Sequence, residues 1–233
     1  MKEKLNTELV SALLGLFAHD LRNPLSALHS NVSFLTSVVG AEDGEAKEAL
    51  EDVAASSDAL GHITDNLELL AMALDGASPR EAIEIPLREF LRETAQKSRR
   101  FAESYRVSLE VDAESAGNLR VIAHRDMLQR ALSNLVRNAI QHAGETGKVS
   151  VHARLDGREA VVSVIDTGTP VPPEVRSLAF TPEGQLSSKN TSGGRYSRGM
   201  GLYAAKVAAE IAGVSVGCVG GDKARFELRV IAR

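Results

Sequence analysis

Residues 17–25 read F-A-H-D-L-R-N-P-L and place a histidine among side chains that can make it a nucleophile. An unperturbed imidazole has a pKa of about 6.5, so a neutral ring nitrogen is available near physiological pH. Asp20 can accept or reinforce the proton on the imidazole, and Asn23 lies one helical turn further on, where it can orient a water molecule. His19, Asp20 and Asn23 are therefore the candidate catalytic residues.

The helix expected to carry His19 has leucines seven residues apart, at Leu14, Leu21, Leu28 and Leu35. This spacing predicts a coiled-coil-like seam, and it places His19 at the outermost position of the heptad. The stretch 40–45 contains two glycines and predicts a connection to a second amphipathic helix over 53–74. A hairpin alone leaves each apolar stripe half covered, so we expect two chains to pair as a dimeric four-helix bundle.

Pro24 falls inside this helical pattern, where proline removes one hydrogen bond and costs about 3 kcal/mol. The heptads continue beyond it, so we expect helix on both sides of Pro24 rather than a helix end near Asn23. Because Pro24 has no N–H, the carbonyl of Asp20 loses its intrahelical partner and the helix can bend there. The pattern predicts a hinge beside the reactive histidine.

Beyond 75–80 the pattern changes to short strands alternating with helices. Helices are expected at 87–105, from Asp126 onward and at about 202–211, with strands at 107–111, 149–155, 160–165, 214–219 and 224–230. Asp156-Gly157 and the stretch 220–223 indicate hairpin turns, and Asp126 with Gln129 resembles a capping box.

The predicted fold class is therefore α+β, in two domains. A helical hairpin, residues 1–76, forms the dimeric four-helix bundle. An α/β sandwich, residues 80–233, follows it, with one mixed sheet covered by helices on one face.

Polar residues in the second domain are suited to a phosphate ligand. Asn134, Asn138 and His142 recur every four residues along one expected helix, and amide oxygens suit Mg²⁺, which takes further ligands from substrate phosphates. The strand at 160–165 is followed by Asp166-Thr-Gly168. A buried aspartate there can accept a hydrogen bond from the exocyclic amine of adenine, and the glycine permits close approach of the backbone to a ligand.

Residues 181–198 are rich in glycine and serine and predict a mobile loop. Its basic residues are Lys189, Arg195 and Arg198, and it leads into a helix start made of Gly199, Met200, Gly201 and Leu202. Free N–H groups at a helix start form an anion site. The loop and helix start together are interpreted as a nucleotide lid that ends in a phosphate cradle.

These motifs together resemble the core of the bacterial two-component sensor histidine kinases. H19-D-L-R-N-P-L resembles the phosphoacceptor box of that family, N134-L-V-R-N138-A its asparagine box, D166-T-G its first glycine box and R198-G-M-G-L its second. They occur in the family's order and approximate spacing over nearly the whole chain. The resemblance implies a gyrase-type ATPase domain that binds ATP with Mg²⁺, phosphorylation of His19, and transfer to an aspartate of a response-regulator receiver domain.

The same resemblance implies roles for single residues. Asp20 would assist the nucleophile, Asn138 would hold the metal, Asp166 would recognise adenine, and Gly199 to Leu202 would meet the phosphates. Asn23 corresponds to the position that the family links with the reverse, phosphatase reaction. The implied partners are a second copy of the chain, the response regulator and, as a source of input, a separate sensor protein.

The chain departs from the family pattern at several positions. Ala18 stands where serine is frequent, Pro170 replaces a glycine, and Gln141 replaces a basic residue. The alternative is therefore a non-catalytic histidine phosphotransferase or scaffold with a degenerate ATPase domain. A third class, an ATP-driven conformational machine of the same superfamily, leaves His19 and Asp20 without a role.

Composition argues against other classes of protein. A net charge of −4 and a pI near 5.9 do not favour binding to nucleic acid. The single cysteine, Cys218, allows no disulfide within the chain, and no apolar run approaches the ~20 residues of a membrane span. No two histidines have the i, i+4 spacing of a transition-metal site. We expect a cytoplasmic protein without membrane insertion.

Overall fold

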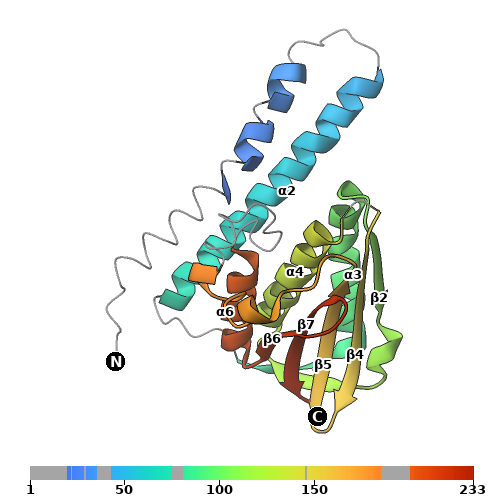
Figure 1. Cartoon of the computed structure of the whole chain (residues 1–233), viewed down its shortest axis with the longest axis vertical. Coiled ribbons are helices and arrows are strands. Elements are labelled where there is room, and N and C mark those ends of the chain that lie inside the picture. The colour runs from blue at the N-terminus through green and yellow to red at the C-terminus, as the bar shows by residue number, and fades with distance from the viewer. Residues whose placement is uncertain are drawn as a thin grey trace. The chain divides into compact units, whose positions relative to one another are not determined.

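The computed structural model describes residues 20–21, 23–28, 30–35, 43–74, 81–144, 146–184 and 200–233. The chain forms two compact units, residues 1–68 and 69–233 (Figure 1). Among the described residues, no helix combines the length and the apolar character that a membrane crossing requires.

The first unit is helical. Residues 20–21, 23–28 and 30–35 have helical backbone, and α2 (Asp43–Leu74) follows as one helix of 32 residues. The predicted second helix is confirmed, and it begins within the stretch 40–45 that was expected to be a connection. The rest of that connection lies outside the described residues.

Helical backbone on both sides of Pro24 agrees with the heptad pattern, which runs through the proline. Leu21, Leu28 and Leu35 are half-buried, as expected for seam positions, whereas Leu14 lies outside the described residues. The helix does not end at Asn23.

Among its described residues, the second unit contains the end of α2 from Leu69, three further helices of at least 12 residues and seven strands. The helices are α3 (Leu87–Ser104), α4 (Arg125–His142) and α6 (Gly201–Ala212), with two short 3₁₀ turns, η1 (Glu114–Ala116) and η2 (Pro173–Val175). The strands are β1 (Ile83–Pro86), β2 (Ser108–Asp112), β3 (Arg120–Ala123), β4 (Lys148–Asp156), β5 (Glu159–Asp166), β6 (Ser215–Val219) and β7 (Ala224–Ile231).

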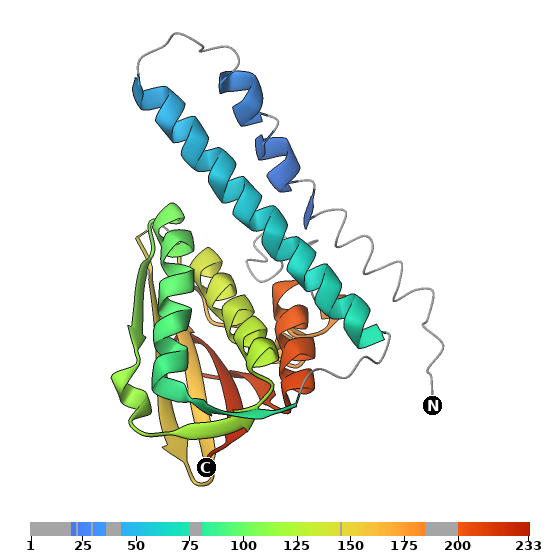
Figure 2. The ribbon, with the colours of Figure 1, turned by 180° about the vertical axis from the view of Figure 1, so that it is seen from behind.

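Five of the strands form one mixed sheet in the order β2-β4-β5-β7-β6. Only β2 and β4 are parallel, and the hairpins β4–β5 and β6–β7 form where their turn sequences predicted them. The three helices lie on one face of this sheet, as the view from behind shows (Figure 2). The predicted α/β sandwich with a mixed sheet covered on one face is thus confirmed.

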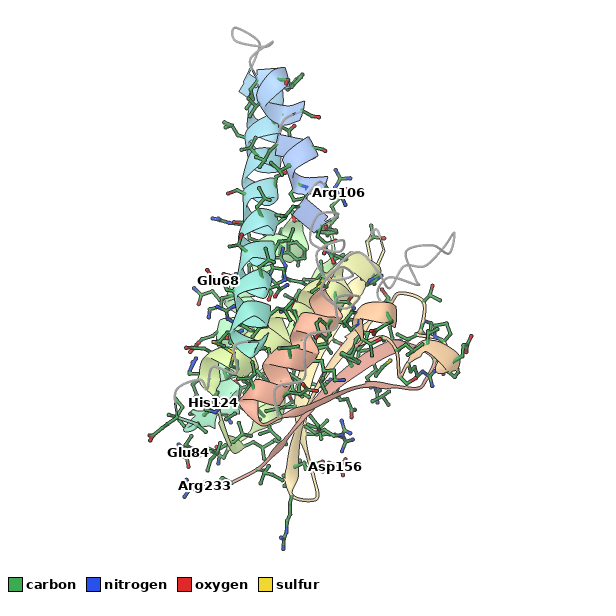
Figure 3. All side chains as sticks on the ribbon, turned by 90° about the vertical axis from the view of Figure 1, so that its left-hand side faces the viewer. Glu68, Glu84, Arg106, His124, Asp156 and Arg233 are labelled. Atoms are coloured by element: carbon green, nitrogen blue, oxygen red, sulfur yellow. The ribbon has the colours of Figure 1, made fainter. Side chains whose placement is uncertain are left out.

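Strands β1 and β3 form a separate antiparallel pair that the sequence did not reveal. Val121 in β3 forms an isolated bridge with Ala232, so this pair extends the end of β7. At the same end, an Arg233 Nη1 atom lies 3.3 Å from Glu84 Oε2, and Figure 3 shows the two residues as neighbours.

The apolar face of α4 packs as its periodicity predicted: Leu128, Leu132, Leu135 and Ala139 are fully buried. The predicted capping box at its start is wrong. The helix begins at Arg125 after His124, and no side chain caps it. Gln129 instead donates hydrogen bonds to Thr94 on α3, at 3.2 Å, and to Ser133, at 3.1 Å. The Gln129 side chain thus bonds to α3 and to its own helix rather than to the backbone at the helix start.

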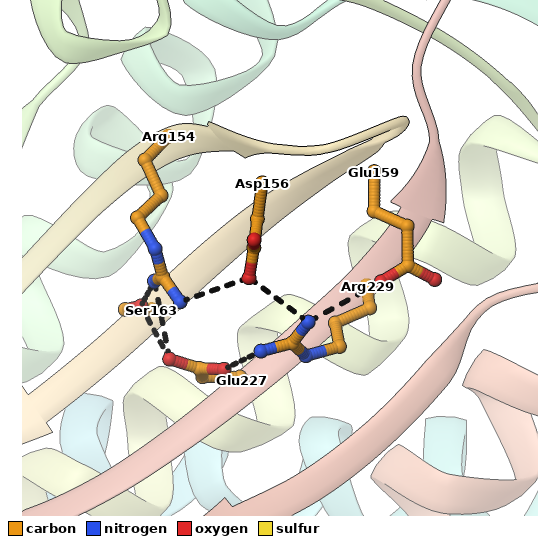
Figure 4. Close-up of polar contacts among 6 residues, drawn as sticks. All are labelled: Arg154, Asp156, Glu159, Ser163, Glu227 and Arg229. Atoms are coloured by element: carbon orange, nitrogen blue, oxygen red, sulfur yellow. Dashed lines mark hydrogen bonds and ion pairs between the residues drawn. The ribbon is translucent and has the colours of Figure 1, made fainter.

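The sheet face away from the helices carries a network of ion pairs (Figure 4). Its members are Arg154, Asp156, Glu159, Ser163, Glu227 and Arg229. Glu227 is buried at its centre, where Arg154 Nη1 lies 3.2 Å from one carboxylate oxygen and Arg229 Nη2 lies 3.0 Å from the other. Burial alone would raise the pKa of Glu227, but the two arginines outweigh that effect and lower it.

Candidate nucleotide-binding site

Asp166 is the last residue of β5, and only 1% of its surface is exposed. Its Oδ1 accepts a hydrogen bond from the Gly168 N–H at 2.8 Å, whereas Oδ2 is buried and has no hydrogen-bond partner among the described residues. Burial raises the pKa of this carboxyl to about 6, although the Gly168 hydrogen bond acts in the opposite direction. A buried acceptor without a donor is costly, so Oδ2 is suited to a ligand that donates a hydrogen bond.

Gly168 brings the chain after β5 against the end of α4. A Cβ atom at this position would lie 2.2 Å from the carbonyl oxygen of His142 and 2.7 Å from Asp166 Oδ1. Both distances are far inside van der Waals contact, so no residue other than glycine fits here without movement of the backbone. The backbone itself therefore holds Asp166 close to the last turn of α4.

Three polar residues four positions apart lie along one side of α4. Asn134, Asn138 and His142 are all buried. Asn134 Nδ2 donates to the Arg130 carbonyl at 3.0 Å. Asn138 Nδ2 has no hydrogen-bond partner among the described residues. An amide can donate through nitrogen or coordinate through oxygen, so Asn138 is able to bind a phosphate or a magnesium ion.

The start of α6 lies beside this row. A Cβ atom at Gly201 would lie 3.6 Å from Asn134 Oδ1, which is ordinary contact distance. The residue before the helix, Met200, is buried, and no side chain of a described residue caps the helix. Because the first N–H groups of a helix lack intrahelical acceptors, this end of α6 can bind an anion.

The structure thus gathers one group of predicted residues in the second unit. They are Asn134, Asn138, His142, Asp166, Gly168, Met200, Gly201 and Leu202. In the first unit, Asp20 is half-buried and Asn23 is exposed, both on helical backbone. His19, Lys189, Arg195, Arg198 and Gly199 lie outside the described residues.

Two residues that sequence reasoning missed also shape the site. Thr167 lies between Asp166 and Gly168, and its hydroxyl bonds to backbone of two other elements. A Cβ atom at Gly147 would lie 2.2 Å from the Ala143 carbonyl oxygen, so this glycine permits a second close approach to the end of α4. The only sequence signal for either was its position beside a strand end.

The described part of the chain contains no cluster of three or more histidine, cysteine, aspartate or glutamate side chains that could hold a metal ion. Mg²⁺ takes several of its ligands from waters and substrate phosphates, so a single protein ligand at Asn138 is compatible with its binding. Three features fit an adenine nucleotide: the Asp166 oxygen that no described residue contacts by a hydrogen bond, the close approach at Gly168 and the helix start at Gly201.

Comparisons with known proteins point to the same chemistry. Residues 10–76 match the family described as His Kinase A (phospho-acceptor) domain. Residues 123–231 match the family described as Histidine kinase-, DNA gyrase B-, and HSP90-like ATPase, which implies ATP binding.

Similar proteins include the sensor histidine kinase GlrK of Escherichia coli, 29% identical over 192 residues, which cover 81% of this chain and 39% of GlrK. A solved catalytic domain of histidine kinase ThkA is 26% identical, with a TM-score of 0.53, covering 65% of this chain and 96% of that one. The structure of histidine kinase ThkA in complex with response regulator protein TrrA matches with a TM-score of 0.62 at 19% identity, and the match covers 96% of this chain and 62% of that one. At this identity the match shows likeness of fold alone. The chain spans only 39% to 44% of the length of the first three curated relatives.

Proposed function

Because the chain belongs to the two-component sensor histidine kinases, we propose that it phosphorylates itself on His19 from ATP and passes the phosphoryl group to an aspartate of a response-regulator receiver domain. We assign dimerisation and phosphotransfer to residues 1–76 and ATP binding to residues 80–233. The reaction consumes ATP, so its proposed place is the cytoplasm.

The observation that carries this proposal is the buried Oδ2 of Asp166, for which the described part of the chain offers no hydrogen-bond partner. The exocyclic amine of adenine is a donor of the kind this oxygen lacks. Gly168 leaves room beside Asp166 where any side chain would collide with backbone. An adenine ring on this floor would satisfy an acceptor that otherwise costs the fold free energy.

The polar row on α4 and the start of α6 would bind the rest of the nucleotide. Asn138 would hold Mg²⁺, which when bound would neutralise charge on the phosphates. The helix start from Gly199 to Leu202 would donate N–H groups to phosphate oxygens. Asn134 and His142 would line the site, and the cations Lys189, Arg195 and Arg198 would close over it.

The chemical step needs positioning more than covalent chemistry from the protein. A ring nitrogen of His19 would form a bond to the γ-phosphorus while the bond to the bridging oxygen of ADP breaks. Asp20 would hold the proton on the other ring nitrogen. An aspartate of the response regulator would then accept the phosphoryl group and regenerate the histidine. In the opposing phosphatase reaction, Asn23 would orient the water that hydrolyses the phosphorylated aspartate of the regulator and releases inorganic phosphate.

Exposed apolar residues support the proposed homodimer. Leu25 and Val32, seven residues apart on the first helix, are 55% and 54% exposed, and Leu50 on α2 is 59% exposed. Large apolar side chains at heptad spacing are stable when a partner helix covers them. A second copy of the hairpin would supply that cover and complete a four-helix bundle.

Incubation of the full chain with γ-labelled ATP and Mg²⁺ tests the proposal. We expect acid-labile, base-stable label on the protein, lost in His19→Gln and retained in His62→Gln, a matched change on α2. The labelled chain should then lose its label to a receiver domain.

Other outcomes would identify a different class. A chain that binds no nucleotide but accepts a phosphoryl group on His19 from another phosphoprotein would be a phosphotransferase. Hydrolysis of ATP without labelling of the protein would indicate a conformational ATPase. Either result would overturn the kinase assignment.

A further inference from the structure

Thr167 connects three elements through one side chain. Its hydroxyl accepts a hydrogen bond from the Lys148 N–H at 3.0 Å and donates one to the Ala143 carbonyl at 3.2 Å. Its own N–H donates to the Lys148 carbonyl at 3.1 Å. The end of β5 is thereby joined to the first residue of β4 and to the end of α4.

The bond to Lys148 explains where β5 ends. Opposite residues in a hydrogen-bonded antiparallel pair normally exchange two backbone bonds. Between Lys148 and Thr167 only one backbone bond forms, and the Thr167 hydroxyl takes the place of the backbone acceptor in the other. The chain is therefore free to leave the sheet after Thr167, and the Gly168 N–H turns back to Asp166 Oδ1.

The bond to Ala143 anchors the same turn to α4. Ala143 is the residue that follows the helix, and carbonyls at a helix end lack intrahelical donors. The Thr167 hydroxyl supplies a donor to this carbonyl, and the His142 carbonyl lies against Gly168. The turn that carries Asp166 is thus tied to the helix that carries Asn138.

We propose that Thr167 is a positioning residue that fixes the Asp166 carboxylate where it can accept the amine of adenine. The inference rests on the proposed function and extends it to a residue that touches no nucleotide in this scheme. Without the hydroxyl, the Lys148 N–H and the Ala143 carbonyl would each lose the partner that holds the turn. Asp166 would keep its place in the sheet and its bond to the Gly168 N–H, but the turn would lose the hydroxyl's tie to α4 and to Lys148, and recognition of the amine would weaken.

The test compares two nucleotides in two variants of the full chain. Thr167→Val keeps the shape and removes the hydroxyl, whereas Thr167→Ser keeps the hydroxyl. Titration calorimetry measures the affinity for ATP and for inosine triphosphate, in which a carbonyl oxygen replaces the amine. We expect Thr167→Val to bind ATP about tenfold more weakly, with little change for inosine triphosphate, and Thr167→Ser to keep the wild-type preference for ATP.

A general structural role would give a different result. If Thr167→Val weakened both nucleotides equally, or weakened neither, the positioning role would be overturned. Thermal melting of the nucleotide-free variants shows whether they remain folded. If the wild-type chain itself bound no ATP, the proposed function would fail, and that outcome is distinct from an unchanged preference in the variant.

Discussion

Replacement of Asp166 by asparagine should stabilise the nucleotide-free protein while it weakens ATP binding. The carboxyl is buried, one of its oxygens has no partner in the part of the chain that the structure describes, and its pKa is raised from the ordinary 3.8 to about 6. That difference corresponds to about 3 kcal/mol against the charged form. Asparagine has the same shape, keeps an acceptor for the Gly168 N–H and carries no charge, so we expect a gain of about 1–3 kcal/mol at pH 8.

The sign of the pH dependence follows from linkage. Because the pKa of Asp166 is higher in the folded than in the unfolded state, its contribution to stability is fully present below about pH 4 and is lost as the pH rises through 6. Asparagine does not titrate. The advantage of Asp166→Asn over the wild type should therefore be largest at pH 8 and shrink toward pH 4.

Tyrosine fluorescence provides a suitable assay. All three tyrosines, Tyr105, Tyr196 and Tyr203, belong to the second unit, and the chain has no tryptophan, so urea titrations followed by this signal report that unit. Asp222→Asn, in the exposed turn between β6 and β7, is the matched control and should change little. A pH-independent difference between Asp166→Asn and the wild type would refute the assignment of a buried, unpaired charge.

Four further predictions follow from the structure and the sequence. Gly168→Ala should abolish ATP binding in calorimetry, because the new Cβ would meet the His142 carbonyl; undiminished binding would contradict this. Glu227→Gln should lower the stability of the second unit by about 1–2 kcal/mol in the tyrosine assay, since two arginines lose their charged partner; no loss would show the network to be neutral. Cys218 should be alkylated at pH 8 about a hundredfold more slowly than a free thiol, because burial raises its pKa to about 11; rapid alkylation of the folded chain would refute this. Pro24→Ala should change the ratio of kinase to phosphatase activity towards a receiver domain, and an unchanged ratio would exclude the hinge.

Periodicity predicted those elements whose side chains alternate between core and solvent over many residues. The buried face of α4 followed from leucines spaced by helical turns, and the β4–β5 hairpin followed from Asp156-Gly157 between two strand patterns. Strands β1 and β3 escaped because each has only four residues, which is too short for an alternation to be recognised. Their pairing also joins segments far apart in the sequence, and no local pattern predicts such a partner.

In the candidate site, too, the residues marked by a local sequence pattern were predictable, and the residue that acts through distant segments was not. Asp166 and Gly168 are predictable because a carboxylate and a glycine directly follow a strand pattern. Thr167 was not, since its hydroxyl acts through Lys148 and Ala143, whose proximity depends on the completed fold. A threonine in a turn is otherwise unremarkable in sequence.

Asp166 and Glu227 are buried carboxylates on the neighbouring strands β5 and β7, and their surroundings differ. The comparison distinguishes a charge that stabilises the fold from one that is suited to binding. Glu227 on β7 pairs with Ser163 on β5. Ser163 lies three residues before Asp166 on the same strand. Both oxygens of Glu227 are paired and its pKa is lowered, whereas one oxygen of Asp166 has no partner within the described ranges and its pKa is raised. Neutralising the first should destabilise the unit, and neutralising the second should stabilise it, although burial is nearly equal. Since a buried charge that only supports the fold is stable when paired, the Asp166 oxygen that has no partner among the described residues is best explained by a role in binding a ligand.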